Sequence, residues 1–222
     1  MPAISQIAKR YNRVMNSFDE KMRRGGGAAI REASSFFMKS DPVHQSLREI
    51  ARRLSESGIN YAVAGGMALV AHGYDRTTVD VDILVTPEGL DAIHKSLSGL
   101  GYVPPFAGSK NLRDTNTGVR IEFIVSGQFP GDGKPKPVAF PDPASVATEI
   151  DGIRYVNLPT LIELKLASGM TNAGRLRDLA DVQELIRVLM LGKSFAAQLN
   201  QYVRDKFCEL WGSLQQGTEQ ED

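Results

Sequence analysis

Cysteine and long apolar runs are scarce in this chain. Cys208 is the only cysteine among the 222 residues, so it has no second thiol in the chain to pair with, which fits a reducing compartment. No run approaches the roughly 18 apolar residues that span a bilayer, and the chain does not begin with a secretory apolar stretch. We therefore expect a cytoplasmic protein that does not enter a membrane, with Cys208 half-buried in a helix.

An excess of one charge is also absent, because 26 Lys and Arg balance 26 Asp and Glu. This balance argues against a wholly basic nucleic-acid binder. The charge is nevertheless uneven, since residues 1–53 hold 11 basic and 5 acidic side chains. A basic front segment can fold onto the acidic body of the chain or meet an anionic partner, and we favour the first.

The front segment has the pattern of an amphipathic helix. Apolar residues recur at three- and four-residue steps from Ile4 to Met22, and Gly25-Gly26-Gly27 ends the pattern. A phosphate loop is a poor alternative for the glycines because no Gly-Lys-Ser/Thr follows, so we expect a hinge. An uncovered apolar stripe of this length would be a contact surface, and we expect it to dock on protein, within the chain or across a dimer.

The rest of the chain mixes strand and helix patterns, which predicts an α+β fold with a small mixed β-sheet. Gly65-Gly66 is expected to be a turn, and the segment from Gly127 to Pro143 a loop. The predicted strands are 60–64, 79–85, about 110–114, 119–125 and an edge strand at 153–157. The predicted helices are 28–38, 42–57, 67–72, 87–100, 160–170, 176–191 and 195–212. The predicted divisions are an N-terminal helical extension (1–40), a core (41–158), a C-terminal helical region (159–214) and a disordered tail (215–222).

Two aspartates stand out in the second strand, Val79-Asp80-Val81-Asp82-Ile83-Leu84-Val85. Side chains alternate along a strand, so Asp80 and Asp82 share the face opposite the valines and lie about 7 Å apart. Burying two carboxylates is costly unless they are paired or bind a cation, and a divalent metal is the simplest reason, since Mg²⁺ prefers such oxygen ligands. The alternative is that both lie at an exposed strand end and cap the neighbouring turn.

Three neighbouring features favour a site. Gly65-Gly66, between a strand and a helix, would let a phosphate chain approach the backbone and the helix N-terminus. Arg76 precedes the aspartates, although it could be an ordinary surface arginine. Glu122 lies opposite the apolar residues of its own strand and is available as a third metal ligand if that strand lies beside the Asp80 strand, unless it only pairs with Arg120.

These residues carry a family resemblance. Ala64-Gly65-Gly66-Met67-Ala68-Leu69 and Arg76-Thr77-Thr78-Val79-Asp80-Val81-Asp82 resemble the core motif of the DNA polymerase β-type nucleotidyltransferase superfamily. The likeness is nearest to the small bacterial branch that includes abortive-infection-type toxin nucleotidyltransferases. Leu161–Ala167 and Arg175–Val182 resemble the helical motif of that branch.

The resemblance implies roles for individual residues. Asp80 and Asp82 would hold the metal ions, and Glu122 would take a third carboxylate position at which many members carry aspartate. Gly65 and Gly66 would cradle the triphosphate, and Lys165 would contact its phosphates. Three further residues would complete the nucleotide site: Arg76, Asp178 and Asp181. Asp178 and Asp181 lie one helical turn apart and could equally brace Arg175 or Arg177.

The implied activity is transfer of a nucleoside monophosphate from an NTP to a hydroxyl of RNA or protein, with release of pyrophosphate. Mg²⁺ or Mn²⁺ would lower the pKa of the attacking hydroxyl and stabilise the leaving pyrophosphate. The second hypothesis is a non-catalytic member of the fold that binds a nucleotide or a protein, such as one half of a toxin–antitoxin pair. His44, His72 and His94 lack metal-ligand spacing, and we expect them to be packing or surface residues.

Overall fold

The computed structural model describes Lys39 and residues 41–218. The helices predicted at 4–22 and 28–38, the glycine hinge between them and the last four residues of the predicted tail lie outside the described residues. Cys208 is half-buried, as expected.

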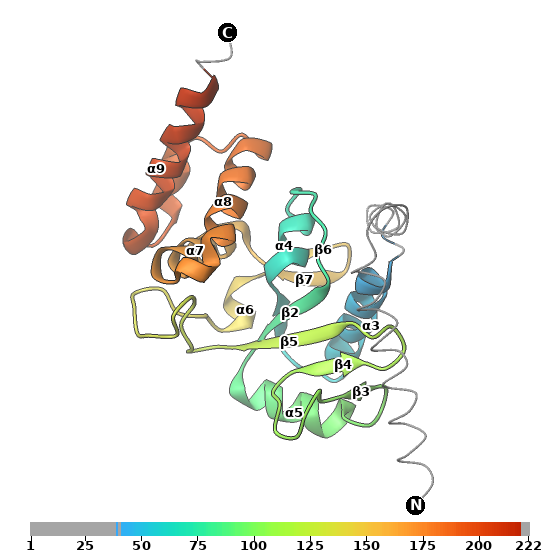
Figure 1. Cartoon of the computed structure of the whole chain (residues 1–222). Helices are drawn as coiled ribbons and strands as arrows, with labels where there is room; N and C mark the ends of the chain where they lie inside the picture. The colour runs from blue at the N-terminus through green and yellow to red at the C-terminus, as the bar shows by residue number, and fades with distance from the viewer. Residues whose placement is uncertain (1–38, 40, 219–222) are drawn as a thin grey trace, which may run out of the picture.

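Within residues 41–218, seven strands form one mixed sheet in the order β3-β4-β5-β2-β1-β7-β6 (Figure 1). Two neighbouring pairs are parallel, β2 with β5 and β1 with β7, and the other neighbours are antiparallel. The predicted α+β fold with a mixed sheet is thereby confirmed. The strands are β1 (Tyr61–Val63), β2 (Asp80–Val85), β3 (Tyr102–Val103), β4 (Leu112–Asp114), β5 (Arg120–Val125), β6 (Ala147–Ile150) and β7 (Ile153–Val156).

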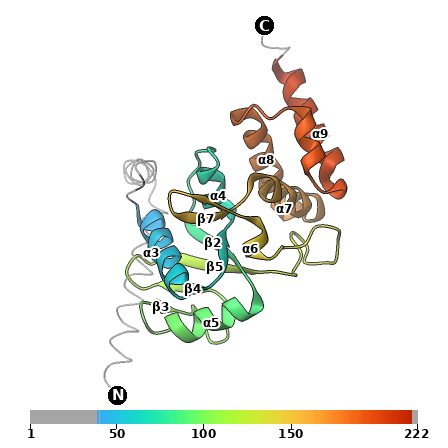
Figure 2. The ribbon, with the colours of Figure 1, turned by 180° about the vertical axis from the view of Figure 1, so that it is seen from behind.

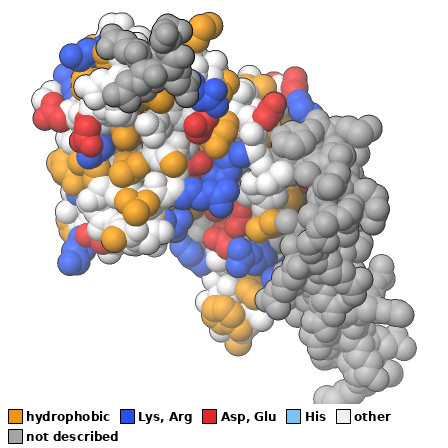
Figure 3. Space-filling view, turned by 45° about the horizontal axis from the view of Figure 1, so that its top comes forward, with side chains coloured by type: hydrophobic (Ala, Val, Ile, Leu, Met, Phe, Trp, Pro, Cys, Tyr) orange, Lys and Arg blue, Asp and Glu red, His pale blue; other side chains and the backbone are white. Residues whose placement is uncertain are grey.

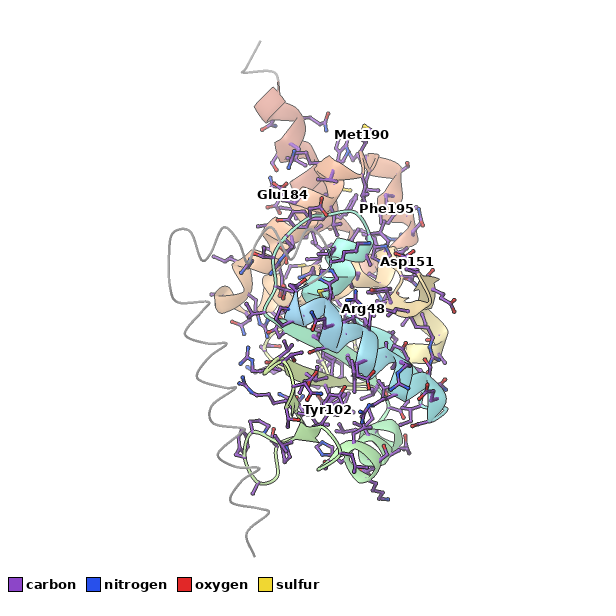
Figure 4. The ribbon with its side chains drawn as sticks, turned by 90° about the vertical axis from the view of Figure 1, so that its right-hand side faces the viewer. Arg48, Tyr102, Asp151, Glu184, Met190 and Phe195 are labelled. Atoms are coloured by element: carbon purple, nitrogen blue, oxygen red, sulfur yellow. The ribbon has the colours of Figure 1, made fainter. Side chains whose placement is uncertain are left out.

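Helices surround this sheet. Figure 4 shows α3, which carries Arg48, lying across the strands. Asp41 caps α3, because its side chain accepts hydrogen bonds from the backbone amides of Val43 and His44. The helices of the core are α3 (Pro42–Glu56), α4 (Gly65–Ala71), α5 (Pro87–Leu97) and the short α6 (Pro143–Val146).

The C-terminal part is helical, as predicted. It consists of α7 (Leu158–Thr171), a 3₁₀ turn η1 (Ala173–Arg175), α8 (Leu176–Val188), a second 3₁₀ segment η2 (Lys193–Gln198) and α9 (Gln201–Thr218). α7 packs against both α8 and α9, and the three form a cluster beside the sheet in Figures 1 and 2. α7 is the most buried of the three, since Leu161, Ile162, Leu164 and Leu166 are all inaccessible to solvent or nearly so.

The prediction of an edge strand at 153–157 was wrong in its position. β7 lies between β1 and β6, and β6 is the true edge strand. Asp151 and Gly152 join β6 to β7, and both have positive φ angles, 51° and 75°. An Asp-Gly pair in this conformation is the favoured two-residue hairpin turn. This signal identifies β6, whose sequence Ala-Thr-Glu-Ile has too few apolar residues to be recognised alone.

Two further boundaries differ from the predictions. Gly65 and Gly66 form the first turn of α4, where a non-helical turn was expected. The last helix begins at Gln201 and continues to Thr218, so four residues of the predicted tail are helical. No helix in the described part of the chain is both long enough and apolar enough to cross a membrane.

Candidate active site

Strands β2 and β5 bring the predicted carboxylates together. They pair in parallel, and their register sets Asp80 beside Arg120 and Asp82 beside Glu122. Val81 and Ile83 are fully buried on the opposite face of β2, so the alternation predicted for this strand is confirmed. Asp82 and Glu122, which are 40 positions apart in the chain, therefore project from neighbouring strands on one face of the sheet.

Asp82 is the least compensated acid of this cluster. Among the described residues, its carboxylate accepts no hydrogen bond and forms no ion pair. Burial raises the pKa of Asp82, and the negative charges of Asp80 and Glu122 raise it further. Lys165 and Arg175 oppose the shift, but the pKa still rises from 3.8 to about 7. A bound cation would stabilise the ionised form of the Asp82 carboxylate.

Arg120 neutralises the other two acids. Its guanidinium lies 3.2 Å from a carboxylate oxygen of Asp80 and 3.4 Å from one of Glu122. Thr78 also donates a hydrogen bond of 2.9 Å to Asp80. The ion pair between Arg120 and Glu122, which was the competing explanation for this glutamate, is thus present. It leaves Asp82 as the carboxylate without a direct partner.

Gly65 touches the Asp82 side chain. A Cβ atom added at Gly65 would lie 1.8 Å from Oδ2 of Asp82, and the φ angle of Gly65 is +57°. Only glycine combines this φ angle with so close an approach. Gly66 plays a different part, since a Cβ atom there would meet the side chain of Thr78 at 2.7 Å. Of the glycine pair, only Gly65 borders the carboxylates.

A cavity of about 340 Å³ opens over Asp82. Of the predicted site residues, five line it: Gly65, Asp82, Glu122, Lys165 and Asp178. The other four, Gly66, Asp80, Arg76 and Asp181, do not. A separate cavity of about 460 Å³ lies between α3, α4 and the β6–β7 turn, on the side where Figure 4 labels Arg48 and Asp151, and none of the predicted site residues lines it.

Two cations of the first cavity were not among the predicted site residues. Lys110 and Arg175 both line it, and within the described part of the chain neither side chain forms an ion pair. Arg175 begins the segment Arg175–Val182, whose resemblance to the helical motif could have identified it as a site residue. Nothing in the sequence around Lys110 marked this residue. Figure 3 shows basic and acidic side chains gathered side by side in the middle of one face of the molecule.

Four of the predicted residues form a buried charge network. Arg76 pairs with Asp181 at 2.7 Å, and the Lys165 ammonium lies 2.7 Å from Asp181 and 2.9 Å from Asp178. Ser168 donates a further hydrogen bond of 2.7 Å to Asp178. Asp181 therefore braces Arg76 and Lys165, where Arg175 or Arg177 was the predicted alternative. The network joins the segment before β2 to α7 and α8.

The residues present fit a divalent cation only in part. Within the described residues, no three His, Cys, Asp or Glu side chains lie close enough together to hold a metal ion. Asp82 and its neighbour Glu122 supply the hard oxygen ligands that Mg²⁺ prefers, and Mg²⁺ commonly uses only one or two protein carboxylates together with water and phosphate oxygens. The histidines are engaged elsewhere: His72 is hydrogen-bonded to the carbonyl of Val156, His94 to that of Lys110, and His44 to the side chain of Asp41.

Comparisons with known proteins identify distant likenesses only. No protein-family model and no curated protein matches the chain. Among solved structures, the chain is similar to an antigenic nucleotidyltransferase-like protein from Paracoccidioides brasiliensis, at 16% identity over 64% of this chain and 74% of that one, with a TM-score of 0.42. It is also similar to a protein from H. pylori described provisionally as a nucleotidyltransferase, at 18% identity over 76% of this chain and 79% of that one, with a TM-score of 0.43. Likenesses this distant assign no activity to this chain.

Proposed function

We propose that the chain is a metal-dependent nucleotidyltransferase that transfers a nucleoside monophosphate from an NTP to a hydroxyl of RNA or protein. The observation that carries the proposal is the unpartnered Asp82 carboxylate in a cavity that also contains unpaired cations, Lys110 and Arg175. A polyphosphate with its divalent cation is a ligand that satisfies both kinds of group at once.

The basic and the acidic residues of the cavity have different proposed roles. Lys110 and Arg175 would bind the phosphate oxygens of the NTP, in the cavity that Gly65 and Asp82 also line. Lys165 is held by Asp178 and Asp181, so its charge is fixed at the cavity wall, where it stabilises anions. Asp82, with Glu122 or Asp80, would hold Mg²⁺ or Mn²⁺, which supplies activation of the acceptor hydroxyl and charge stabilisation of the leaving pyrophosphate.

The reaction balances without an oxidant or reductant. The acceptor oxygen bonds to the α-phosphorus, the bond from that phosphorus to the β-phosphate oxygen breaks, and the hydroxyl proton is released. Electrostatic positioning accounts for most catalysis in phosphoryl transfer, so a site with one fixed cation, two unpaired cations and an unpartnered carboxylate suits this chemistry.

The decisive experiment incubates the protein with each α-labelled NTP, Mg²⁺ or Mn²⁺, and a panel of tRNA and protein acceptors. We expect label transfer by the wild type and by Asp91→Asn, an exposed aspartate of α5 outside the cavity, and loss of transfer in Asp82→Asn. Equal labelling by wild type and Asp82→Asn would contradict the mechanism. NTP binding that stabilises the fold without any label transfer would favour the non-catalytic alternative, and a ligand at 100 times its dissociation constant should add about 2.7 kcal/mol.

A further inference from the structure

A second cavity adjoins the one over Asp82. It has a volume of about 630 Å³ and lies between the loop that follows β3 and the surfaces of β4 and β5. Its lining includes Phe106, Lys110, Asn111, Arg120 and Glu122. A volume of this size lies within the range of small-molecule sites.

The two cavities share a wall. Lys110, Asn111 and Glu122 line both of them, so a molecule in one would meet a molecule in the other at these residues. Asn111 is held in place, because its side-chain oxygen accepts a hydrogen bond of 2.9 Å from the backbone amide of Phe123. The shared wall therefore holds a fixed amide side chain, Asn111, together with an unpaired cation, Lys110, and a carboxylate, Glu122.

Phe106 is an exposed aromatic residue on a stiff loop. The side chain is 69% exposed, and Pro104 and Pro105 precede it. The backbone amide of Ser109 donates a hydrogen bond of 3.1 Å to the Phe106 carbonyl, and Gly108 in this turn has a φ angle of +79°. Prolines and a closed turn restrict the loop, so the ring is presented to solvent at the cavity edge rather than packed into the core.

We propose that this second cavity is the acceptor site, and that it takes the 3′ end of a single-stranded nucleic acid with a base stacked on Phe106 and a phosphate on Lys110. The proposal rests on the function proposed above, since the acceptor hydroxyl would reach the NTP at the shared wall. A positive groove with an aromatic platform is the usual combination for binding single strands without base reading. Arg120 also lines this cavity, but its guanidinium is already paired with Asp80 and Glu122, so Lys110 is the cation left for a phosphate.

A peptide acceptor fits this cavity less well. An extended peptide commonly binds by adding a strand to a free sheet edge. Here β4 is already paired with β3 and β5, and β5 with β4 and β2, so neither strand offers a free edge. The groove presents the exposed ring of Phe106 and the unpaired cation Lys110, which complement a base and a phosphate, and its carboxylate, Glu122, is paired with Arg120.

The test measures equilibrium binding of a fluorescent 12-nucleotide single strand with a free 3′-hydroxyl, as RNA and as DNA, to the full chain without NTP. Stacking on an aromatic side chain is worth roughly 1–3 kcal/mol, so Phe106→Ala should weaken binding about fivefold or more. Leu100→Ala is the matched control, because Leu100 is 66% exposed, lies in the loop before β3 and lines neither cavity. It should bind as the wild type does.

The salt dependence of binding provides an independent test of the phosphate contact. Lys110→Gln should reduce the slope of log affinity against log salt by about 0.7, the value for one phosphate contact on a single strand. Lys193→Gln, at an exposed site in η2, should leave the slope unchanged. RNA bound more tightly than DNA would identify the 2′-hydroxyl as part of the recognition, and equal binding would identify the shared chemistry of bases and phosphates; both support the proposal.

The acceptor site and the proposed activity fail in different ways. Equal affinity of Phe106→Ala and Leu100→Ala, or no binding of either strand, would overturn the acceptor site even if Asp82-dependent transfer to protein is observed. Transfer that does not depend on Asp82 would contradict the activity, whatever the binding experiment gives.

Discussion

At the scale of single residues, Asp82 differs from the acids around it in having no direct partner. Asp80 has Thr78 and Arg120, and Glu122 has Arg120, whereas the Asp82 carboxylate is partly buried between them. A charge held this way destabilises the fold in the absence of a cation. A cation that binds Asp82 would remove this destabilisation.

This cost predicts a pH dependence. The folded-state pKa of Asp82, about 7, is above the ordinary value of 3.8, so the folded protein binds this proton more tightly than the unfolded chain does. Stability should therefore fall as pH rises between about 4 and 7. Urea unfolding should give a difference in unfolding free energy, Asp82→Asn minus wild type, that is larger at pH 8 than at pH 5 by about 2 kcal/mol. A difference that is the same at both pH values would be inconsistent with the raised pKa.

The three carboxylates should also differ in activity. Asp80→Ala and Asp82→Ala should abolish transfer, and Glu122→Gln should weaken metal dependence less than either, because its oxygen remains a weak ligand. Only the change at Asp82 should stabilise the metal-free protein, since Asp80 is already paired with Arg120. Transfer rate and melting temperature, each measured across a Mg²⁺ titration, would rank the three variants. Equal losses of transfer activity at all three positions would mean that Glu122 is as important a metal ligand as the aspartates.

At the scale of elements, the junction between β1 and α4 fits the backbone closely to Asp82. Ala64 donates its amide to the backbone carbonyl of Asp82 at 2.9 Å, and Gly65 then begins the helix with a positive φ angle. This arrangement leaves no room for a side chain at position 65. The glycine matters here for space as well as for conformation.

Two glycine substitutions separate these effects. Gly58 has a φ angle of +65° but open space around a Cβ atom, so Gly58→Ala should cost only the left-handed strain of roughly 1–2 kcal/mol. Gly65→Ala should cost more and should abolish transfer, because the methyl group displaces the Asp82 carboxylate. In the Asp82→Ala background the extra cost should shrink, which a double-mutant cycle in urea would measure. An equal cost at positions 58 and 65 would refute the close contact.

At the scale of the whole molecule, the buried network of Arg76, Lys165, Asp178 and Asp181 connects the sheet to the C-terminal helices. Asp181 is 3% exposed and lies between two cations from distant parts of the chain. Removing one partner of a buried ion pair leaves an uncompensated charge, which typically costs about 3–5 kcal/mol. The network therefore holds Lys165 at the cavity wall and also fixes the helices in place.

Asp181→Asn should accordingly destabilise the protein by about 3 kcal/mol. The control is Glu56→Gln, which removes an exposed ion pair with Arg52 on α3 and should cost less than about 1 kcal/mol. Both are measured by chemical unfolding with the full chain. Similar small losses for the two variants would show that the network contributes little to stability.

Local sequence alone determined which side chains share a face. The period of two along a strand places Asp80 and Asp82 together, and Glu122 opposite its apolar neighbours, because backbone geometry sets this alternation without help from the rest of the chain. The same holds for Pro42–Glu56, whose capping aspartate, first-turn proline and apolar spacing predict the helix closely. Motif resemblance extended the prediction to Lys165 and the aspartates of α8.

Tertiary structure decided which charges meet. Arg76 and Asp181 are 105 positions apart, and only the packing of α8 against the segment before β2 makes them partners. The parallel register of β2 and β5 puts Arg120 between Asp80 and Glu122, while Lys110 remains free in the wall between two cavities. These outcomes depend on long-range pairing and on competition among many cations for few carboxylates, which the local pattern of the chain does not encode.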